Sequence, residues 1–414
     1  MVSDYGLPVS EETVSDPLAH IAQLQREFKV PQLDELPLFS GGLVGYFGYE
    51  TVQLIEPKLM CREKRDDLGT ADIELLLSEE VAVLDNLEGR LWLIIHADPA
   101  QQGAFALAQK RLDELENQLR GAGTPYGLRV SGEAVKEADF SYGFNRADFI
   151  DAVEKSREYI LAGDIFQVVL SQRMSAPFEA RPLDVYRSLR ALNPSPYMYF
   201  IDLGDTQIVG SSPEVLVRVQ NRRVTLRPIA GTRKRGKTPS EDQALAEELM
   251  NDPKERAEHL MLIDLGRNDV GRVAKTGSVE MTDQMIIERY SHVMHIVSEV
   301  QGDLDEGLSA MDAIRAAFPA GTLSGAPKFR AMEIINELEP VKRNIYAGAV
   351  GYISWHDDTD LAIAIRTAVI HEGKLHVQAG AGIVVDSDAG KEWQETRDKG
   401  RALITAVDRA SRGL

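Results

Sequence analysis

Three observations predict an α+β protein that contains large antiparallel β-sheets. In the amino-terminal portion, two strand-like runs separated by a short turn are followed by one long helix, which is typical of an α+β protein. Near the carboxyl end, strand-like runs at 346–354, 361–371, 375–379 and 382–385 are separated only by short turns, a spacing typical of an antiparallel meander. The chain has 414 residues, and its 43% hydrophobic content is sufficient for a sizeable core.

The first 145 residues predict a mixed segment followed by a connection. A helix is expected at 17–28, a closely packed glycine-rich strand at 40–49, strands at 80–84 and 90–96, and a helix at 101–119. Residues 121–145 carry Gly and Pro at short intervals and favour an internal linker. The expected division is therefore 1–120, a linker at 121–145, and a main region at 146–414.

Composition narrows the possible partners and compartment. The formal net charge of −19 argues against nucleic acid or an anionic membrane as a partner. The single cysteine, Cys61, lies in a charged run and excludes an intrachain disulfide. Neither a membrane-spanning apolar run nor the apolar region of a signal peptide is found, so a soluble cytoplasmic protein is expected.

An acidic helix is predicted at 252–269. Asp252 suits the N-cap and Glu255 the capping-box position. At 3.6 residues per turn, Glu255, Glu258 and Leu262 share one face, which directs two carboxylates toward the core. Because buried charges require partners, something positive is expected to meet them.

A second acidic pair, Glu392 and Glu395, has the same spacing on a helix predicted at 391–397. Two such pairs facing one cleft would form an oxygen-lined site suited to Mg²⁺. The alternative is structural: Glu255 caps its helix, Glu395 pairs with Lys399 four residues later, and each pair is a solvated helix face.

Isolated polar residues in apolar surroundings give further candidates. Arg366 lies in the apolar run 361–370 and requires an anion. Gln167 begins an apolar strand and Glu214 opens an alternating one. Simpler interpretations are a backbone-bonded Gln167, a Glu214 that only forms a turn, and a His295 that is an ordinary core histidine.

Small residues mark candidate places where backbone approaches a ligand. Gly231 and Thr232 lie in a basic segment at 227–237, and Thr322 lies in a small-residue loop that opens a helix at 327–337. The Gly380-Ala381-Gly382 segment is expected to join two strands and present its amides to a carboxylate. Each feature is also compatible with an ordinary loop or cap.

Taken together, these segments resemble the chorismate-utilising enzymes, and within them the anthranilate synthase component I group. The matching segments occur in the family's order at 228–232, 252–269, 288–298, 320–328, 346–352, 361–368 and 378–397. The resemblance implies a two-lobed sandwich of large antiparallel sheets with helices on the outside. The family's usual first ~80 residues, with a Leu-Leu-Glu-Ser string, have no counterpart before residue 40, so a shortened amino-terminal region is expected.

The resemblance also distinguishes reactions within the family. Members that add water to chorismate carry a lysine where this chain has Gln167, and aminodeoxychorismate synthases carry a lysine in the segment where it has Ala230. The remaining pattern implies that chorismate and ammonia become anthranilate and pyruvate. The alternatives are an aminodeoxychorismate synthase and a non-catalytic regulatory protein that binds tryptophan or chorismate.

Site roles follow from the same resemblance. Glu258 and Glu395 are expected to hold Mg²⁺, aided by Glu255 and Glu392, while Glu214 acts as general acid and His295 serves pyruvate elimination. Gln167 and Thr322 are expected to be catalytic residues alongside Glu214 and His295, and the expected substrate contacts are Gly231, Thr232, Tyr346, Arg366, Gly380, Ala381 and Gly382. Ammonia is expected from a separate glutamine amidotransferase subunit, and Pro196, Tyr197 and Met198 match half of the family's tryptophan-binding pocket.

Overall fold

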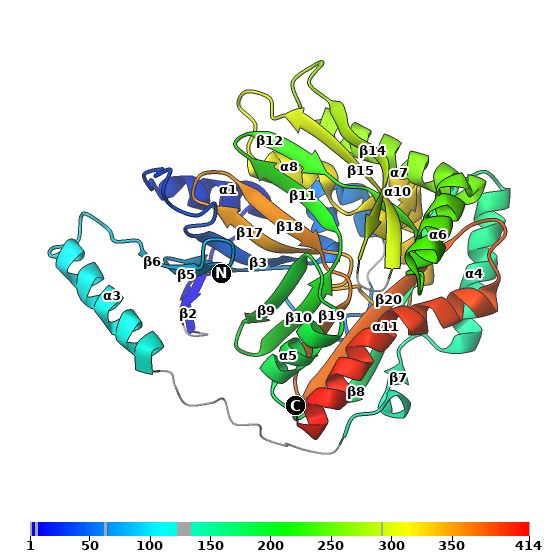
Figure 1. Cartoon of the computed structure of the whole chain (residues 1–414), viewed down its shortest axis with the longest axis horizontal. Helices are drawn as coiled ribbons and strands as arrows, with labels where there is room; N and C mark the ends of the chain where they lie inside the picture. Colours follow the sequence, from blue (N-terminus) through cyan, green and yellow to red (C-terminus); the bar gives the residue numbers. More distant parts are fainter. Residues whose placement is uncertain (1, 5–6, 62–63, 122–133, 291–292, 414) are drawn as a thin grey trace.

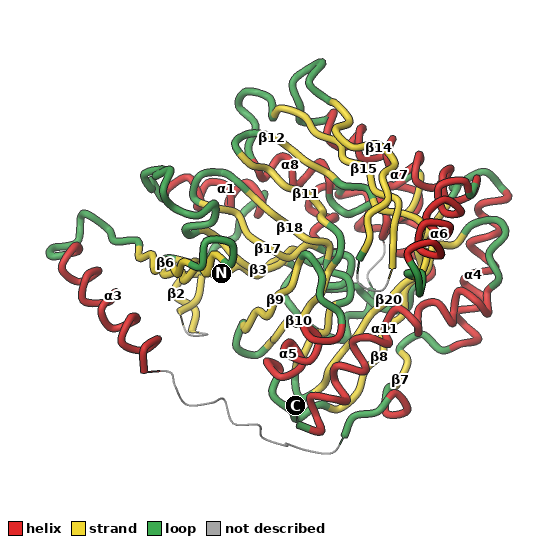
Figure 2. The backbone as a smooth tube through the Cα atoms, viewed as in Figure 1, coloured by secondary structure: helices red, strands yellow, loops and turns green. Residues whose placement is uncertain are grey.

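The computed structural model describes residues 2–4, 7–61, 64–121, 134–290 and 293–413. Two large antiparallel sheets form its body, and most of the helices pack on their outer surfaces (Figure 1). Figure 2 shows the same arrangement by element type, with strands inside and helices around them. The predicted α+β class with large antiparallel sheets is confirmed.

The larger sheet combines strands from distant parts of the sequence. Its amino-terminal strand β3 pairs with β17 along its full length, from Gly42 opposite Ser354 to Phe47 opposite Ala349. Its neighbouring order is β13 (Ile229–Lys234), β15 (Val293–Asp303), β12 (Arg223–Leu226), β11 (Val215–Gln220), β18 (Thr359–Ile363), β17 (Ala349–Ser354), β3 (Gly42–Phe47) and β4 (Ile73–Ser78), with β14 (Glu280–Arg289) also on β15.

The second sheet is centred on the long pair β8 and β20, which keeps one register from Lys374 opposite Pro177 to Ile383 opposite Val168. Its order is β16 (Gly325–Ala326), β8 (Gln167–Pro177), β20 (Lys374–Ile383), β19 (Thr367–His371), β10 (Thr206–Ser212) and β9 (Tyr197–Asp202), with β7 (Ser141–Tyr142) also on β8. Separate hairpins are β1 (Val2–Asp4) with β2 (Leu7–Ser10) and β5 (Glu80–Asp85) with β6 (Arg90–Ile95).

Helices cover the sheets and carry much of the candidate site. Helix α11 packs on β20, α5 and α4, whereas α7 packs on β13 and β15. The α-helices are α1 (Pro17–Glu27), α2 (Val52–Ile55), α3 (Ala104–Gly121), α4 (Arg146–Leu161), α5 (Pro182–Leu192), α6 (Pro239–Asn251), α7 (Pro253–Gly271), α8 (Ala310–Ala317), α9 (Gly321–Ser324), α10 (Lys328–Leu338) and α11 (Ala389–Arg412). Short 3₁₀ helices are η1 (Tyr49–Thr51), η2 (Pro57–Cys61) and η3 (Glu137–Asp139).

Two expected strand boundaries near the carboxyl end are wrong. The run 361–371 is interrupted at Arg366, whose φ of +49° is incompatible with a continuous strand, so the run divides between β18 and β19. Conversely, Gly380, Ala381 and Gly382 do not join two strands but lie inside β20. The long pairing partner β8 keeps these small residues extended.

The chain crosses between the two sheets at two points that lie together. Glu214 connects β10 of the second sheet to β11 of the larger one, and Arg366 connects β18 to β19. The Ile363 amide donates to the Glu214 carbonyl at 2.9 Å, and the Ser211 amide donates to the Arg366 carbonyl at 3.1 Å. These bonds fix two charged residues side by side where the sheets meet.

Only part of the expected linker at 121–145 belongs to the described residues. Residues 122–133 of the expected linker lie outside the described residues, while β7 within it pairs with β8.

In the described part of the chain, no helix combines the length and apolar character required to span a membrane.

Candidate active site

The Glu214 side chain lies half-buried at the sheet crossing. The Thr322 hydroxyl, from α9, donates to its Oε2 at 3.0 Å. Burial raises the pKa of Glu214 above its ordinary value, although the Thr322 hydrogen bond and the charges of Arg366 and Lys399 oppose the rise. A carboxyl group with a raised pKa is suited to donate a proton.

Arg366 lies beside Glu214 and contributes an uncompensated positive charge. Burial lowers its pKa, and its electrostatic neighbours are Glu214 and Tyr290. Within the described residues, its guanidinium has neither a hydrogen bond nor an ion pair. A half-buried guanidinium of this kind favours an anionic ligand, as the sequence predicted.

The His295 side chain is held by the segment that carries Gly231 and Thr232. Its Nδ1 lies 2.8 Å from the Gly231 carbonyl oxygen and 3.1 Å from the Thr232 hydroxyl. Since a carbonyl only accepts, Nδ1 carries the hydrogen and Nε2 is the basic nitrogen of the neutral ring. Burial lowers the pKa of His295, which favours that neutral form.

Backbone geometry explains the glycine at 231. Its φ is +68°, and a Cβ there would lie 3.2 Å from the Glu255 carboxylate and 3.0 Å from Leu249. Glycine therefore suits both the conformation and the available space. The adjacent Arg233 pairs with Glu255 at 3.2 Å, which connects this strand to α7.

Strand β20 brings a second small-residue surface to the site. Tyr346 is buried and bonds to the backbone of Gly380, and a Cβ at Gly380 would lie 2.8 Å from the Tyr346 hydroxyl. A Cβ at Gly382 would lie 2.6 Å from the Gln167 amide nitrogen. Because the β19 pairing ends at Val377, residues 380–382 leave one edge of β20 free of that neighbour.

The two acidic pairs meet around a lysine. Lys399 donates to the Glu395 carboxylate at 2.8 Å and to the Gly380 carbonyl oxygen at 2.9 Å. Its charge also acts on Glu258 and Glu392. The carboxylates from α7 and α11 therefore share one positive neighbourhood, in which Glu395 remains 46% exposed.

Like charge and burial raise the pKa of Glu258 and of Glu392. For Glu258 the causes are burial and the Glu255 carboxylate, opposed by a hydrogen bond from Gln167. For Glu392 they are burial and Glu395, opposed by a bond with Ser387. Among the described residues, no group of three or more His, Cys, Asp or Glu side chains has metal-binding geometry.

One local expectation about α7 is wrong. Asp252 does cap the helix, accepting from the amides of Lys254 and Glu255. Glu255, however, does not complete a capping box, because its carboxylate pairs with Arg233 on β13. The nearby arginine provides a stronger partner than a backbone amide.

Sequence reasoning did not identify two cations of the site. Lys399 was recognised only as an i,i+4 partner of Glu395, and Lys254 was not singled out. The sequence feature that indicates them is a lysine within about one helical turn of each acidic pair. Their convergence depends on the packing of α7 and α11 against different sheets.

The residues expected to form half of a tryptophan pocket lie in a separate cluster. The Tyr197 hydroxyl donates to Asp360 at 2.8 Å, and Arg218 bonds both Asp360 and the Tyr197 oxygen. Met198 packs against a hydrophobic cluster, and Pro196 is exposed. The cluster centres on Asp360 and Arg218, but it borders the Glu214 crossing, because Tyr197 and Met198 pair with Ser212 and Ser211 at the end of β10.

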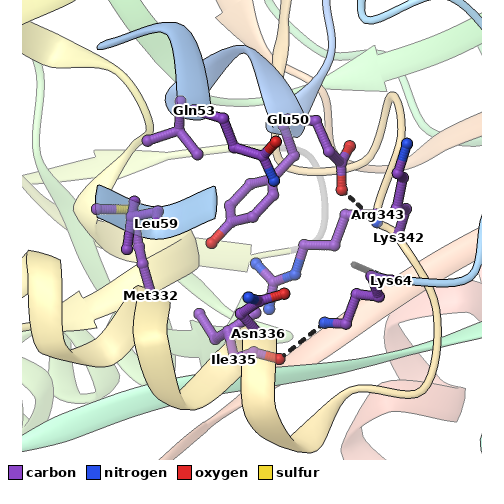
Figure 3. A pocket seen from close by; sticks show the side chains of 11 residues that line it. Glu50, Gln53, Leu59, Lys64, Met332, Ile335, Asn336, Lys342 and Arg343 are labelled. Carbon is purple, nitrogen blue, oxygen red and sulfur yellow. Dashed lines mark hydrogen bonds between the residues drawn. The ribbon is translucent and has the colours of Figure 1, made fainter. Parts of the chain in front are cut away.

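A cavity of about 30 Å³ lies between η1, α10 and the segment at Arg343 (Figure 3). Figure 3 shows Glu50 and Arg343 on its wall, with the Glu50 carboxylate accepting from the Arg343 amide at 3.0 Å. The Arg343 guanidinium pairs with Glu339 at 2.6 Å and is 1% exposed. This cavity adjoins the scaffold rather than the Glu214 and Arg366 crossing.

With this geometry established, comparison with known proteins defines the class. A family model described as chorismate binding enzyme matches residues 8–405. The chain belongs to the chorismate-binding enzyme family, and it is an enzyme that uses chorismate.

Individual relatives indicate a particular group within this family. The chain is 57% identical to "Anthranilate synthase component 1" of Pseudomonas putida over 97% of its own length and 82% of the relative's. It is 55% identical to the protein of that name from Pseudomonas aeruginosa, over 100% and 84%. The crystal structure of anthranilate synthase component I from Streptococcus pneumoniae superposes with a TM-score of 0.85 at 43% identity, covering 94% of this chain and 85% of that one.

Proposed function

We propose that the enzyme is the large subunit of an anthranilate synthase, converting chorismate and ammonia to anthranilate, pyruvate and water. The observation that carries the proposal is the juxtaposition of a half-buried, unpaired Arg366 with protonatable Glu214. A substrate that is a dianion with a poor leaving group needs both features. The 57% identity to a protein of that name supports the choice of reaction.

Arg366 and Tyr346 would bind the enolpyruvyl carboxylate of chorismate. Arg366 supplies the charge, and the Tyr346 hydroxyl, held beside Gly380, supplies a donor. The stretch of β20 from Gly380 through Ala381 to Gly382, beyond the β19 pairing, and the Gly231-Thr232 stretch of β13 would complete the cradle. Glycine at these positions lets the substrate approach the backbone closely.

Glu214 would protonate the departing 4-hydroxyl as ammonia adds at ring carbon 2. The bond between the ring carbon and the hydroxyl oxygen breaks, and the hydroxyl leaves as water because the acid donates a proton to it. Thr322 orients the carboxyl group through its 3.0 Å hydrogen bond. Gln167, a neutral amide beside Gly382, cannot serve as a base and instead orients Glu258.

His295 would act in the second half of the reaction, in which pyruvate is eliminated and the ring becomes aromatic. Its Nδ1–H is committed to the Gly231 carbonyl, so Nε2 is the atom that accepts a proton. Its lowered pKa keeps Nε2 unprotonated near neutral pH.

Glu258 and Glu395, with Glu255 and Glu392 nearby, would hold Mg²⁺. The fit is one of donor chemistry: carboxylate oxygens are the ligands that Mg²⁺ prefers, and burial together with a neighbouring carboxylate raises the pKa of Glu258 and of Glu392. When bound, the ion supplies electrophilic help at the ring carboxylate. Lys399 offsets the same negative charge without the ion.

Ammonia would come from glutamine through a separate amidotransferase subunit. Within the chain, the single cysteine Cys61 lacks the glycine-flanked setting of a glutaminase nucleophile. The Tyr197–Asp360–Arg218 cluster, with Pro196 and Met198, is the proposed place for tryptophan feedback.

The test is to mix the purified chain with chorismate, ammonium and Mg²⁺ and follow anthranilate fluorescence. Product that disappears with a chelator and returns with Mg²⁺ supports the proposal. Aminodeoxychorismate in place of anthranilate would favour the alternative synthase. A folded chain that binds chorismate or tryptophan without turnover would favour a regulatory protein.

A further inference from the structure

A second cavity adjoins the proposed acid. It encloses about 50 Å³ and is bounded by Glu214 and Thr322 on one side and by α7 on the other. The α7 wall includes Gly266 and Asp269. Since one water requires about 10–15 Å³, the cavity has room for a few water-sized molecules.

Most of the cavity wall is apolar, which makes its polar groups conspicuous. Leu262 and Leu265 line it from α7, and Ala317, Ala320 and Ile363 line it from other elements. The polar side chains in the wall are those of Glu214, Thr322, Arg227 and Asp269, so a small polar molecule inside has few hydrogen-bonding partners. Asp269 is the one that α7 contributes.

Asp269 lies at the inner wall with half of its carboxylate unused. Its side chain is 4% exposed, and Oδ2 accepts from the Lys328 ammonium at 2.9 Å. Its Oδ1 is buried and has no hydrogen-bond partner in the described part of the structure. An unpartnered buried carboxylate oxygen is costly and rare, so a donor that occupies the cavity is expected.

The size of the cavity, its mostly apolar wall and the free acceptor on Asp269 together suit a water-sized molecule that donates a hydrogen bond. Ammonia meets this description, and the proposed reaction consumes it beside Glu214. Water has the same size and donors, so the two must be separated by experiment.

We propose that this cavity, the nucleophile pocket, holds ammonia before it attacks chorismate, with Asp269 Oδ1 accepting one of its N–H bonds. The proposal rests on the anthranilate synthase function proposed above. Asp269 is accordingly a positioning residue: it contacts the nucleophile before the reaction and takes no proton from it.

Two variants test the pocket by different means. Asp269→Asn retains an oxygen for Lys328 but turns an amide NH₂ toward the pocket, replacing the acceptor by a donor. Gly266→Ala adds a methyl group to the wall, where the new Cβ would lie 3.4 Å from Pro228, an ordinary contact. Alanine is also preferred to glycine inside a helix, so this variant is expected to fold.

Steady-state rates are measured with chorismate and with ammonium varied separately at fixed pH. For both variants the expected result is a KM for ammonium about tenfold higher with the KM for chorismate unchanged, because Asp269→Asn loses roughly one hydrogen bond and Gly266→Ala loses part of the space. The matched control is Asp184→Asn on α5, where the buried aspartate already pairs with Arg181 and Arg187 and lines neither of the two cavities described above.

The outcomes separate this inference from the proposed function. If the wild-type chain forms no anthranilate from ammonium, the proposed function fails. If it does, but both variants keep the wild-type KM for ammonium, the pocket holds only water and the inference is overturned. Equal increases in both KM values, or a similar effect of Asp184→Asn, would also overturn it by indicating a general structural disturbance.

Discussion

Two buried or half-buried arginines in this protein have opposite surroundings. Arg343 is 1% exposed, pairs with Glu339 at 2.6 Å and donates to the carbonyls of Leu323 and Val169 at 2.8 and 2.7 Å. Its guanidinium also lies over the rings of Tyr49 and Tyr346. Arg366 has Glu214 near it but no direct hydrogen bond or ion pair in the described structure.

The difference separates scaffold from site. The bonds of Arg343 connect β8, α9, α10 and the amino-terminal segment, so its charge is used within the protein. The charge of Arg366 is left available at a sheet crossing, which costs folding energy and is useful when an anion binds. Tyr346 belongs to both environments, since it lies under Arg343 and beside Gly380.

The largest expected effect is on the scaffold. Arg343→Met should lower the free energy of unfolding by about 3–5 kcal/mol, because it leaves the buried Glu339 carboxylate without its partner. Chemical denaturation followed by circular dichroism measures this loss. Arg120→Met, at an exposed pair with Glu116, is the control and should change stability by less than about 0.5 kcal/mol. Equal stability of the two variants would contradict the scaffold role.

Arg366→Gln should reduce activity and leave stability unchanged or higher, the reverse of Arg343→Met. The kcat/KM for chorismate should fall between about 30-fold and a few thousand-fold, corresponding to roughly 2–5 kcal/mol for a lost charge contact. The melting temperature should stay the same or rise, since the side chain has no internal partner to lose. Steady-state kinetics and thermal unfolding, measured on the same preparation, distinguish a role of Arg366 in the site from a role in the scaffold. A large drop in melting temperature would place Arg366 with the scaffold.

Glu50 gives a pH test of the scaffold. Burial raises its pKa from 4.5 to about 7, although the amides of Arg343 and Asn344 donate to it. The folded state thus binds this proton more tightly than the unfolded state. Stability from this group is therefore present below pH ~4.5 and is lost as the pH rises toward ~7, by up to about 3 kcal/mol.

Glu50→Gln should remove that part of the pH dependence, because the amide does not titrate. Unfolding free energies measured between pH 5 and 7.5 for both proteins provide the comparison. The control Glu116→Gln, at an exposed position, should retain the wild-type slope. Parallel slopes for wild type and Glu50→Gln would show that Glu50 does not titrate in this range.

The smallest expected effect concerns Lys399. Lys399→Met should tighten Mg²⁺ binding about fivefold, because it removes one partly exposed positive charge, worth roughly 1 kcal/mol, from beside Glu395. Isothermal titration with Mg²⁺ or Mn²⁺ measures this without turnover. Lys110→Met, at an exposed pair on α3, is the control. Weaker binding in Lys399→Met would mean that the lysine supports the ion site rather than competing with it.

Local sequence patterns predicted the secondary structure that carries the site. The helix-forming patterns of α1, α7 and α10 depend on neighbouring residues, and those helices lie close to their expected positions. Arg366 was also recognised from its own neighbours, since a charge within an apolar run demands a partner. The same local reasoning joined β18 to β19, because nothing nearby in the sequence marks the left-handed backbone at Arg366.

The sequence alone predicted an α+β chain with an antiparallel meander, two helices that each present a pair of acids, and an arginine within an apolar run. Only the tertiary structure decided that Glu214 and Arg366 occupy adjacent crossings between sheets, and that the charge of Lys399 on α11 acts on Glu258 of α7. The physical reason is range. Caps and periodicity act over a few residues, whereas sheet pairing and charge convergence depend on segments more than a hundred residues apart, whose alignment is set by the packing of the whole core.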